Sequence, residues 1–328
     1  MSRINNAITE IKDFGFGYLW EHTRYNATKS AEYLQRMDSR RDKVYSRMTE
    51  DELLDATQSI YNRMMGLHSD IRHPETFSEK IQWLKVMDAT PIKTQLSDKI
   101  LVKDWISKKI GSEYVIPTVG AVEGYSSFDE INFEELPSKF ILKLNTGSGM
   151  NYPVKEKSSL DVENAKKTID QWMTYHYHWN SIELQYRDIQ KRVFAEKYIE
   201  EMDGNLYDYK IPCFGGKPMW IECTGDRNLL KHTGYQRYFD LDWNSLDWSD
   251  ETYPDFQHDV AKPDCLDEMI RIARELSKGF KFVRVDLYDV NGRVLFGEMS
   301  FTPSSGLVPY KGRWNREKDL EIGKLLVI

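Results

Sequence analysis

Two acidic residues near the C-terminal end of the sequence could hold a divalent cation. In residues 283–288 the two-residue period of a strand places Arg284 and Asp286 on one face, and Glu298 and Ser300 follow a turn with the same spacing. Carboxylates brought close together repel each other unless a cation lies between them. Carboxylate oxygens suit Mg²⁺, which in turn binds nucleotide phosphates. The segment therefore predicts either a metal site for a nucleotide or an exposed strand with solvated charges.

The turn between the two segments decides whether these acids meet. A two-residue loop at Asn291-Gly292 pairs Asp286 with the residue before Glu298, which sends the two carboxylates to opposite faces. A three-residue loop, residues 290–292, shifts the pairing by one and puts both carboxylates on one face. We predict the three-residue loop, closed by Gly292 in the left-handed conformation.

A lysine followed by a Gly/Ser loop is a second candidate, for phosphate. Lys143 lies on a predicted strand over 140–145, and residues 146–149 read Thr-Gly-Ser-Gly. An ammonium group and backbone N–H groups can together hold phosphate oxygens. The segment matches neither a Walker loop nor a dinucleotide fingerprint. An ordinary flexible turn is the alternative.

A third candidate is the predicted strand over 193–200, which ends in acidic residues and could line a nucleotide crevice. An edge strand with charged ends is the alternative.

A basic cluster follows the central hairpin of this otherwise acidic chain, and we hypothesise that part of it binds an acidic substrate. A solvated basic loop is the other interpretation. The cluster consists of Arg227, Lys231, His232 and Arg237.

The elements that must position these residues form a mixed pattern. Residues 1–75 are predicted to be helical, and Thr76 or Ser78 is predicted to cap the next helix. Further helices are expected from 97 or 98 to 111, from a cap at Asp161 to 173, and from a cap at Asp264 to 276. Strands are expected at 114–117, 140–145, 152–155 and 193–200, with hairpins over 207–223 and 283–302. Strands in short hairpins with helices between them predict an α+β fold.

Composition narrows the class of protein. The chain has 328 residues and a net charge of −7, which disfavours a dedicated nucleic-acid binder. Its apolar runs fall far short of the roughly 20 residues of a membrane-spanning helix, and acidic residues near the N-terminus exclude a secretory signal. Three cysteines without a Cys-x-x-Cys pair fit a reducing cytoplasm. Aromatic residues over 14–20 leave peripheral contact with a membrane open.

Taken together, the motifs resemble the TupA-like ATP-grasp proteins of bacterial surface-polysaccharide biosynthesis. The resemblance covers roughly 76–310 and is carried by residues 77–85 (FSEKIQWLK), 97–99, 140–149, 208–210, 283–288 and 297–303. It implies an α+β ATP-grasp fold, in which two subdomains grip ATP, with an N-terminal helical extension. The implied boundaries are 1–75 for the extension, 76–135 for an associated region, and 136–201 and 202–328 for the two subdomains.

The resemblance also implies roles for individual residues. Arg284 and Lys210 would be catalytic, with Arg284 binding the γ-phosphate or an acyl phosphate. Asp286, Glu298 and Ser300 would hold Mg²⁺, although many ATP-grasp enzymes have Asn where this chain has Ser300. The residues that would contact ATP are Lys103, Lys143, Thr146, Gly147, Ser148, Gly149, Glu196, Tyr198, Glu200, Glu201 and Lys210.

The implied chemistry is ATP-dependent carboxylate–amine ligation. ATP phosphorylates a carboxylate, and an amine attacks the acyl phosphate to form an amide. The expected partners are a small-molecule or saccharide carboxylate, such as a uronic acid, and an amine, with no nucleic acid. The alternatives are a kinase that phosphorylates a sugar hydroxyl, a glycosyltransferase that uses a nucleotide sugar, and a non-catalytic scaffold. The sequence identifies neither the amine nor the oligomeric state.

Overall fold

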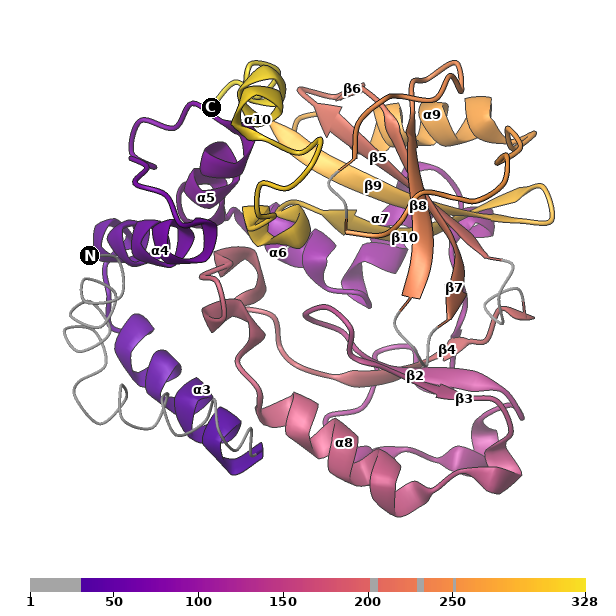
Figure 1. Cartoon of the computed structure of the whole chain (residues 1–328). Coiled ribbons are helices and arrows are strands. Elements are labelled where there is room, and N and C mark those ends of the chain that lie inside the picture. The colour runs from indigo at the N-terminus through magenta and orange to yellow at the C-terminus, as the bar shows by residue number, and fades with distance from the viewer. Residues whose placement is uncertain (1–30, 201–205, 229–232, 250–251) are drawn as a thin grey trace.

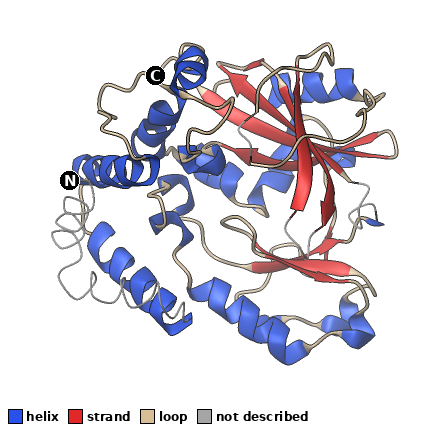
Figure 2. Cartoon of the chain, viewed as in Figure 1, coloured by secondary structure: helices blue, strands red, loops and turns tan. Residues whose placement is uncertain are grey.

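The computed structural model describes residues 31–200, 206–228, 233–249 and 252–328, which form two antiparallel sheets with helices around them (Figures 1 and 2). The smaller sheet has the strand order β1-β4-β2-β3, and the larger has the order β10-β9-β5-β7-β8, with β6 paired to β5. The strands are β1 (Thr118–Val119), β2 (Phe140–Leu144), β3 (Asn151–Val154), β4 (Val193–Lys197), β5 (Tyr207–Phe214), β6 (Lys217–Pro218), β7 (Ile221–Asn228), β8 (Thr233–Phe239), β9 (Phe282–Val290) and β10 (Arg293–Ser300). The expected α+β class is confirmed.

The described helices flank these sheets, and most begin with the local signals expected of them. Thr76 caps α5 in a reciprocal pair with Glu79, and Asp161 caps α8 by accepting a hydrogen bond from the N–H of Asn164. The α-helices are α3 (Ala31–Tyr45), α4 (Glu50–Met65), α5 (Phe77–Met87), α6 (Pro91–Ser97), α7 (Leu101–Lys109), α8 (Val162–Thr174), α9 (Leu266–Leu276) and α10 (Arg316–Gly323). Within the described residues, no helix combines the length and apolar character needed to cross a bilayer.

Several predicted boundaries were wrong. The strand predicted over 114–117 does not form: Ser112–Tyr114 is a 3-10 turn, Val115 makes an isolated β-bridge with Phe296, and a strand begins only at β1. The strand predicted to 200 ends at Lys197. Asp264 does not cap α9, because Cys265 occupies the cap position without a side-chain hydrogen bond. The helix predicted from 97 or 98 begins at Leu101, after the Asp98 carboxylate accepts the N–H groups of residues 100 and 101.

An outer helix covers each sheet, α8 the smaller and α9 the larger (Figure 1), and apolar side chains fill the space between. In the smaller sheet, Phe140 and Leu142 pack with Ala165 and Ile169 of α8. In the larger sheet, the side chains that pack with α9 come from alternate positions of β5, β7 and β9. They include Ile211, Cys213, Ile221, Cys223, Val283, Val285 and Leu287. The period of two then directs the polar residues between them to the opposite face, toward the other sheet.

The β9–β10 hairpin does not have the predicted three-residue loop. Asn291 and Gly292, with φ of 57° and 80°, form a two-residue turn, and the register from it pairs Phe296 with Leu287. A β-bulge then inserts Gly297, so Glu298 lies opposite Asp286. The two carboxylates therefore share a face, as expected, because of a bulge and not because of the loop length.

Glycine is required at this bulge because the backbone approaches its neighbours closely. A Cβ atom at Gly297 would lie 3.0 Å from the carbonyl oxygen of Asp286 and 3.1 Å from the ring of Tyr288. In a regular ladder without the bulge, Gly297 would pair with Asp286, and Glu298 would continue the alternation of Val294 and Phe296, which point into the apolar core. The bulge thus moves Glu298 from the core face to the polar face.

Candidate active site

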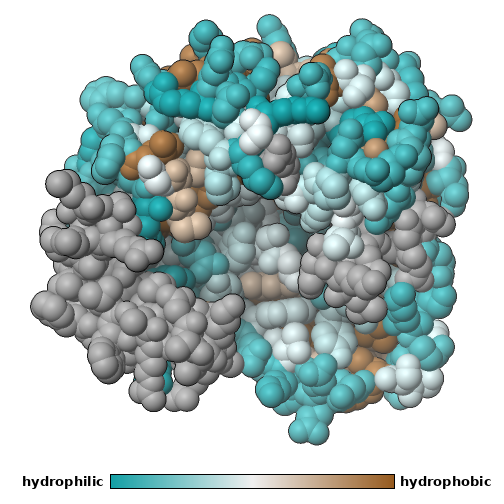
Figure 3. Space-filling model, viewed as in Figure 1, coloured by the Kyte–Doolittle hydropathy of each residue, from teal (hydrophilic) through white to brown (hydrophobic). Residues whose placement is uncertain are grey.

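A cavity of about 480 Å³ lies between the polar faces of the two sheets. A space-filling view shows a hollow at the centre of this face of the molecule (Figure 3). Its lining comes from segments up to 200 positions apart in the chain. The predicted site residues that line it are Lys103, Lys143, Gly147, Ser148, Gly149, Glu196, Lys210, Arg284, Asp286, Glu298 and Ser300.

The smaller sheet and α7 together contribute a cationic wall, defined here as Lys143 of β2, Glu196 of β4, Lys103 of α7 and Lys99 just before α7. The Nζ atom of Lys103 lies 2.7 Å from Glu196 Oε1, and Lys143 donates to the other oxygen of the same carboxylate. Burial alone would raise the pKa of Glu196, but the two ammonium groups hold it below its ordinary value. Lys103 also donates to the carbonyl oxygen of Ile116 at 2.6 Å. Three lysines face one carboxylate, so this wall is positive.

The Gly/Ser loop, residues 146–149, is held against this wall. Lys99 donates a hydrogen bond to the carbonyl oxygen of Gly147, and burial lowers the pKa of this lysine. A Cβ atom at Gly147 would come within 2.9 Å of the Tyr177 ring, so glycine lets the loop pack on this tyrosine. Thr146 lies behind the cavity, and its buried hydroxyl has no hydrogen-bond partner among the described residues. Sequence reasoning missed Lys99, although it belongs to the quoted segment 97–99.

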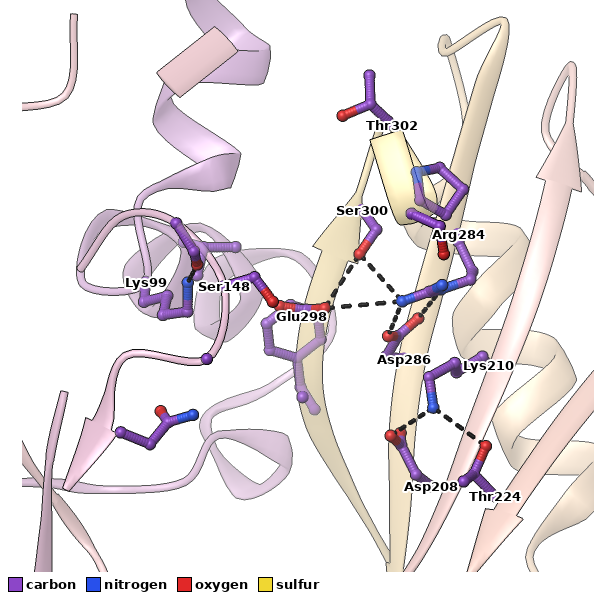
Figure 4. A pocket seen from close by; sticks show the side chains of 18 of the residues that line it. Lys99, Ser148, Asp208, Lys210, Thr224, Arg284, Asp286, Glu298, Ser300 and Thr302 are labelled. Carbon is purple, nitrogen blue, oxygen red and sulfur yellow. Dashed lines mark hydrogen bonds and ion pairs between the residues drawn. The ribbon is translucent and has the colours of Figure 1, made fainter. Parts of the chain in front are cut away.

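The larger sheet contributes an acidic wall around Arg284 (Figure 4). The guanidinium group binds both oxygens of Asp286, at 2.7 and 2.6 Å, and lies 3.7 Å from Glu298 Oε1. The Ser300 hydroxyl accepts from Arg284 at 3.3 Å and donates to Glu298 at 3.1 Å. Burial raises the pKa of Asp286 to about 7, with Glu298 and Asp208 adding to the shift against the opposing effect of Arg284. These carboxylates are therefore short of positive charge.

This donor set fits a magnesium ion. Asp286 and Glu298 supply two carboxylates on one face, and Mg²⁺ commonly takes one or two carboxylates and completes its shell with phosphate oxygens and water. Within the described part of the chain, no group of three or more His, Cys, Asp or Glu side chains is placed to hold a metal by itself. A nucleotide would therefore have to supply part of the coordination.

The polar face of the larger sheet continues beyond the acidic wall. Lys210 faces Asp286 on β9 and Glu222 on β7, and its Nζ atom lies 2.5 Å from Asp208 Oδ2. Thr224 also lines the cavity here, with its hydroxyl 3.5 Å from Lys210. Lys210 is therefore paired within the sheet and does not contact the lysines of the cationic wall.

A third wall, residues 302–306, follows directly after β10. Ser304 and Ser305 have φ of 49° and 55°, a left-handed conformation that is unfavourable for residues other than glycine. The buried carboxylate of Glu183 stabilises it by accepting hydrogen bonds from the hydroxyls of Thr302 at 2.5 Å and Ser305 at 2.7 Å. Gln82 donates to the carbonyl oxygens of Ser305 and Gly306, both at 2.9 Å. No motif in the sequence indicated this role for Glu183.

Some predicted site residues lie away from the cavity. Tyr198 is buried outside its lining, and Glu200 forms a surface ion pair with Lys139 at 2.8 Å. Arg237 donates to Asp255 at 2.7 Å and to the carbonyl oxygen of Phe256 at 2.8 Å, so its guanidinium group is turned toward residues 255–258. Glu201, Lys231, His232 and the side chain of Arg227 lie outside the described residues.

The family model described as TupA-like ATPgrasp matches residues 79–327. No curated protein sequence matches the chain. Among solved structures, D-alanine–D-alanine ligase from Bacillus anthracis complexed with ATP is 16% identical, with a TM-score of 0.38, over 71% of this chain and 62% of that chain. L-Amino acid ligase from Bacillus licheniformis is 12% identical, with a TM-score of 0.43, over 81% and 56%. D-Cycloserine synthetase DcsG is 16% identical, with a TM-score of 0.40, over 84% and 92%.

The present chain spans about three fifths of the length of the first of these ligases. All three TM-scores lie below 0.5. The family match is different in kind, because it covers most of the chain and includes β2, the Gly/Ser loop and the whole β9–β10 hairpin.

Proposed function

Because the chain belongs to the TupA-like ATP-grasp family, as the sequence motifs predicted, we propose that it is an ATP-dependent carboxylate–amine ligase. One observation carries this proposal: Lys99 and Lys143 line the same cavity as Arg284, Asp286 and Glu298. A cationic wall opposite paired carboxylates is the arrangement that a metal-bound triphosphate requires.

In this proposal the cationic wall binds the phosphates of ATP, and the acidic wall binds the cation and the transferred phosphoryl group. Lys143 and Lys99 bind phosphate oxygens of ATP, and the backbone of the Gly/Ser loop covers them. Asp286 and Glu298 would hold Mg²⁺, which neutralises charge on the phosphates when it is bound. Arg284 lies within reach of both carboxylates and binds the phosphoryl group during its transfer.

The base of ATP fits the apolar corner of the cavity. Val102, Val115 and Ile116 line this corner beside Lys103. Apolar side chains bury the faces of a flat ring, whereas the charged walls suit phosphates. Glu196, which the resemblance places against adenine, serves here to hold Lys103 and Lys143 in position.

The acyl phosphate is the proposed intermediate. The carboxylate of the substrate attacks the γ-phosphorus and ADP leaves. The amine, once it has lost the proton of its ammonium form, attacks the acyl carbon, and phosphate leaves with the second proton as the amide forms. For the carboxylate we propose a uronic acid or another acidic group in surface-polysaccharide biosynthesis, as the resemblance of the sequence motifs implies. The use of ATP and the three buried free cysteines support a cytoplasmic location.

A screen for ADP formation tests this function. Uronic acids and acidic amino acids are each paired with a panel of amino acids and simple amines in the presence of Mg·ATP. We expect ADP release that requires both a carboxylate and an amine, and hydroxylamine should trap the acyl phosphate as a hydroxamate. ADP release with a sugar that lacks a carboxyl group would instead support the kinase, and would overturn the ligase.

A further inference from the structure

A row of polar side chains on β5, β7 and β8 has no role in the mechanism described above. We call Asp208, Glu222, Thr224 and Gln236 the polar row. Asp208 pairs with Thr224, and Thr224 pairs with Gln236, so the row crosses three neighbouring strands. All four line the cavity, and the exposed fractions of Asp208, Thr224 and Gln236 are 6%, 0% and 3%.

Gln236 shows that this row lacks a hydrogen-bond donor. Its Nε2 atom lies 2.7 Å from Glu222 Oε1, and an ionised carboxylate only accepts, so the orientation of the amide is determined. The buried Oε1 atom then has no hydrogen-bond partner among the described residues. A buried acceptor left unsatisfied costs about 1–3 kcal/mol. Because Gln236 lines the cavity, a ligand that donates an N–H or O–H group could remove this cost.

The charges of the row show which donor it favours. Two carboxylates, Asp208 and Glu222, share one nearby ammonium group, that of Lys210, at 2.5 and 3.9 Å. Arg284, on the adjacent strand, is bound to both oxygens of Asp286. The row is therefore rich in acceptors and short of positive charge. A phosphate or carboxylate would be repelled, whereas a primary ammonium group offers one positive charge and three donors.

The polar row lies close to the residues that are proposed to hold the phosphoryl group. Lys210 lies directly between Asp286 and Glu222 in the sheet, and neighbouring strands lie about 4.8 Å apart. A small molecule bound to the row can therefore reach the phosphoryl group held by Arg284. We propose that the polar row is the subsite for the amine substrate, which it binds as a primary ammonium group. This inference rests on the proposed ligase function and adds the location and charge of its second substrate.

A matched pair of ligands tests the subsite without turnover. L-Alaninamide and L-lactamide differ only in an ammonium group against a hydroxyl, and each is titrated by ligand-observed NMR into the full chain with Mg²⁺ and a non-hydrolysable ATP analogue. We expect L-alaninamide to bind at least tenfold more tightly. Gln236→Met should weaken its binding three- to tenfold and Glu222→Gln at least tenfold. The same substitution at an exposed position, Gln171→Met on α8, is the control and should change nothing.

The outcomes separate this inference from the proposed function. Unchanged affinity for the ATP analogue in each variant shows that the fold and the ATP site are intact. If the analogue binds but L-alaninamide has no advantage over L-lactamide, or if D-glucose binds better than both, the amine subsite is overturned and the ligase is not. If the analogue fails to bind to the wild type, the ligase is overturned, while titration of L-alaninamide alone still decides the subsite.

Discussion

The two sides of the cavity carry opposite charge: lysines are in excess on one side and carboxylates on the other. On one side, Lys103 of α7 and Lys143 of the smaller sheet bind the buried carboxylate of Glu196, and Lys99 lines the same cavity. On the larger sheet, Arg284 and Lys210 lie among four carboxylates, including Asp286 and Glu298. One wall therefore has positive charge to offer, and the other requires it.

This difference explains how a single cavity can hold a triphosphate together with a cation. Phosphate oxygens favour the lysine wall, and a divalent ion between the phosphates and the carboxylates satisfies the acidic wall. Each wall also keeps its charges in place before a ligand arrives, because Glu196 positions two lysines and Asp286 positions Arg284. The cavity is thus preorganised for the charges that it is proposed to bind.

The largest effect is expected when the acidic wall loses its exposed carboxylate. Glu298→Gln keeps the shape of the side chain but removes the charge that would hold the cation, so we predict a loss of turnover of at least about 100-fold. Turnover is measured by ADP release and stability by thermal unfolding, which should be almost unchanged. Glu163→Gln, at an exposed position on α8, is the control. Wild-type turnover in Glu298→Gln would remove the metal assignment.

In the cationic wall, loss of Lys143 should mainly weaken ATP binding, whereas loss of Lys103 should mainly lower stability. Lys143→Met removes an ammonium group beside the Gly/Ser loop, and we predict about 10- to 100-fold weaker binding of ATP, equivalent to about 1.4–2.8 kcal/mol. Lys103→Met should weaken ATP binding only a few-fold, because this lysine already donates to Glu196 and to a backbone carbonyl. It should instead lower the free energy of unfolding by about 1–3 kcal/mol. Titration with ATP and urea unfolding measure both quantities, and a larger ATP effect at Lys103 would contradict this division.

Two glycines of one hairpin test whether the bulge builds the acidic wall. We predict that Gly297→Ala weakens Mg²⁺-dependent ATP binding about tenfold, because a Cβ atom would press on the backbone of Asp286. Gly292→Ala, at φ of 80° in the turn, should lower stability by about 1 kcal/mol and leave that binding unchanged. Equal losses of ATP affinity in both variants would show that the bulge has no special role.

Behind the third wall, the expected effect is on stability and not on turnover or ATP binding. Lys85 is fully buried on α5, donates to Gln82 at 2.7 Å, and has its pKa lowered by burial to about 8. Between pH 8 and 10.5 the unfolded chain binds more protons at this lysine than the folded chain does. The stability of the wild type relative to Lys85→Met should therefore rise with pH in that window, by on the order of 2–3 kcal/mol.

Urea unfolding of both proteins at pH 8 and at pH 10 measures this difference. Comparing the two proteins at each pH removes the contribution of groups that they share. A constant difference, or one that falls as the pH rises, would show that the folded protein keeps Lys85 charged. The buried ammonium group of Lys85 would then be stabilised in its charged form by its surroundings, which include the carboxylate of Glu183.

The sequence correctly predicted features that depend on neighbouring residues. The Thr76 and Asp161 caps, the Lys143 strand and the paired arms of the last hairpin all follow from local spacing. The segments that carry the family resemblance are local in the same sense. The predicted Asp264 cap and the strand at 114–117 were wrong, because Cys265 takes the cap position of α9 and β1 begins only at Thr118.

What the sequence alone determined was therefore the set of charged residues and the period that separates polar from apolar faces. Only the tertiary structure decided that Glu298 joins Asp286, because the bulge at Gly297 depends on a close contact across the hairpin. It also brought Glu183 behind the third wall, 119 positions from Thr302 in the chain, and left the Gln236 Oε1 atom without a donor among the described residues. Alternation is a property of one strand, whereas the facing of two charged walls arises only when distant strands pack together.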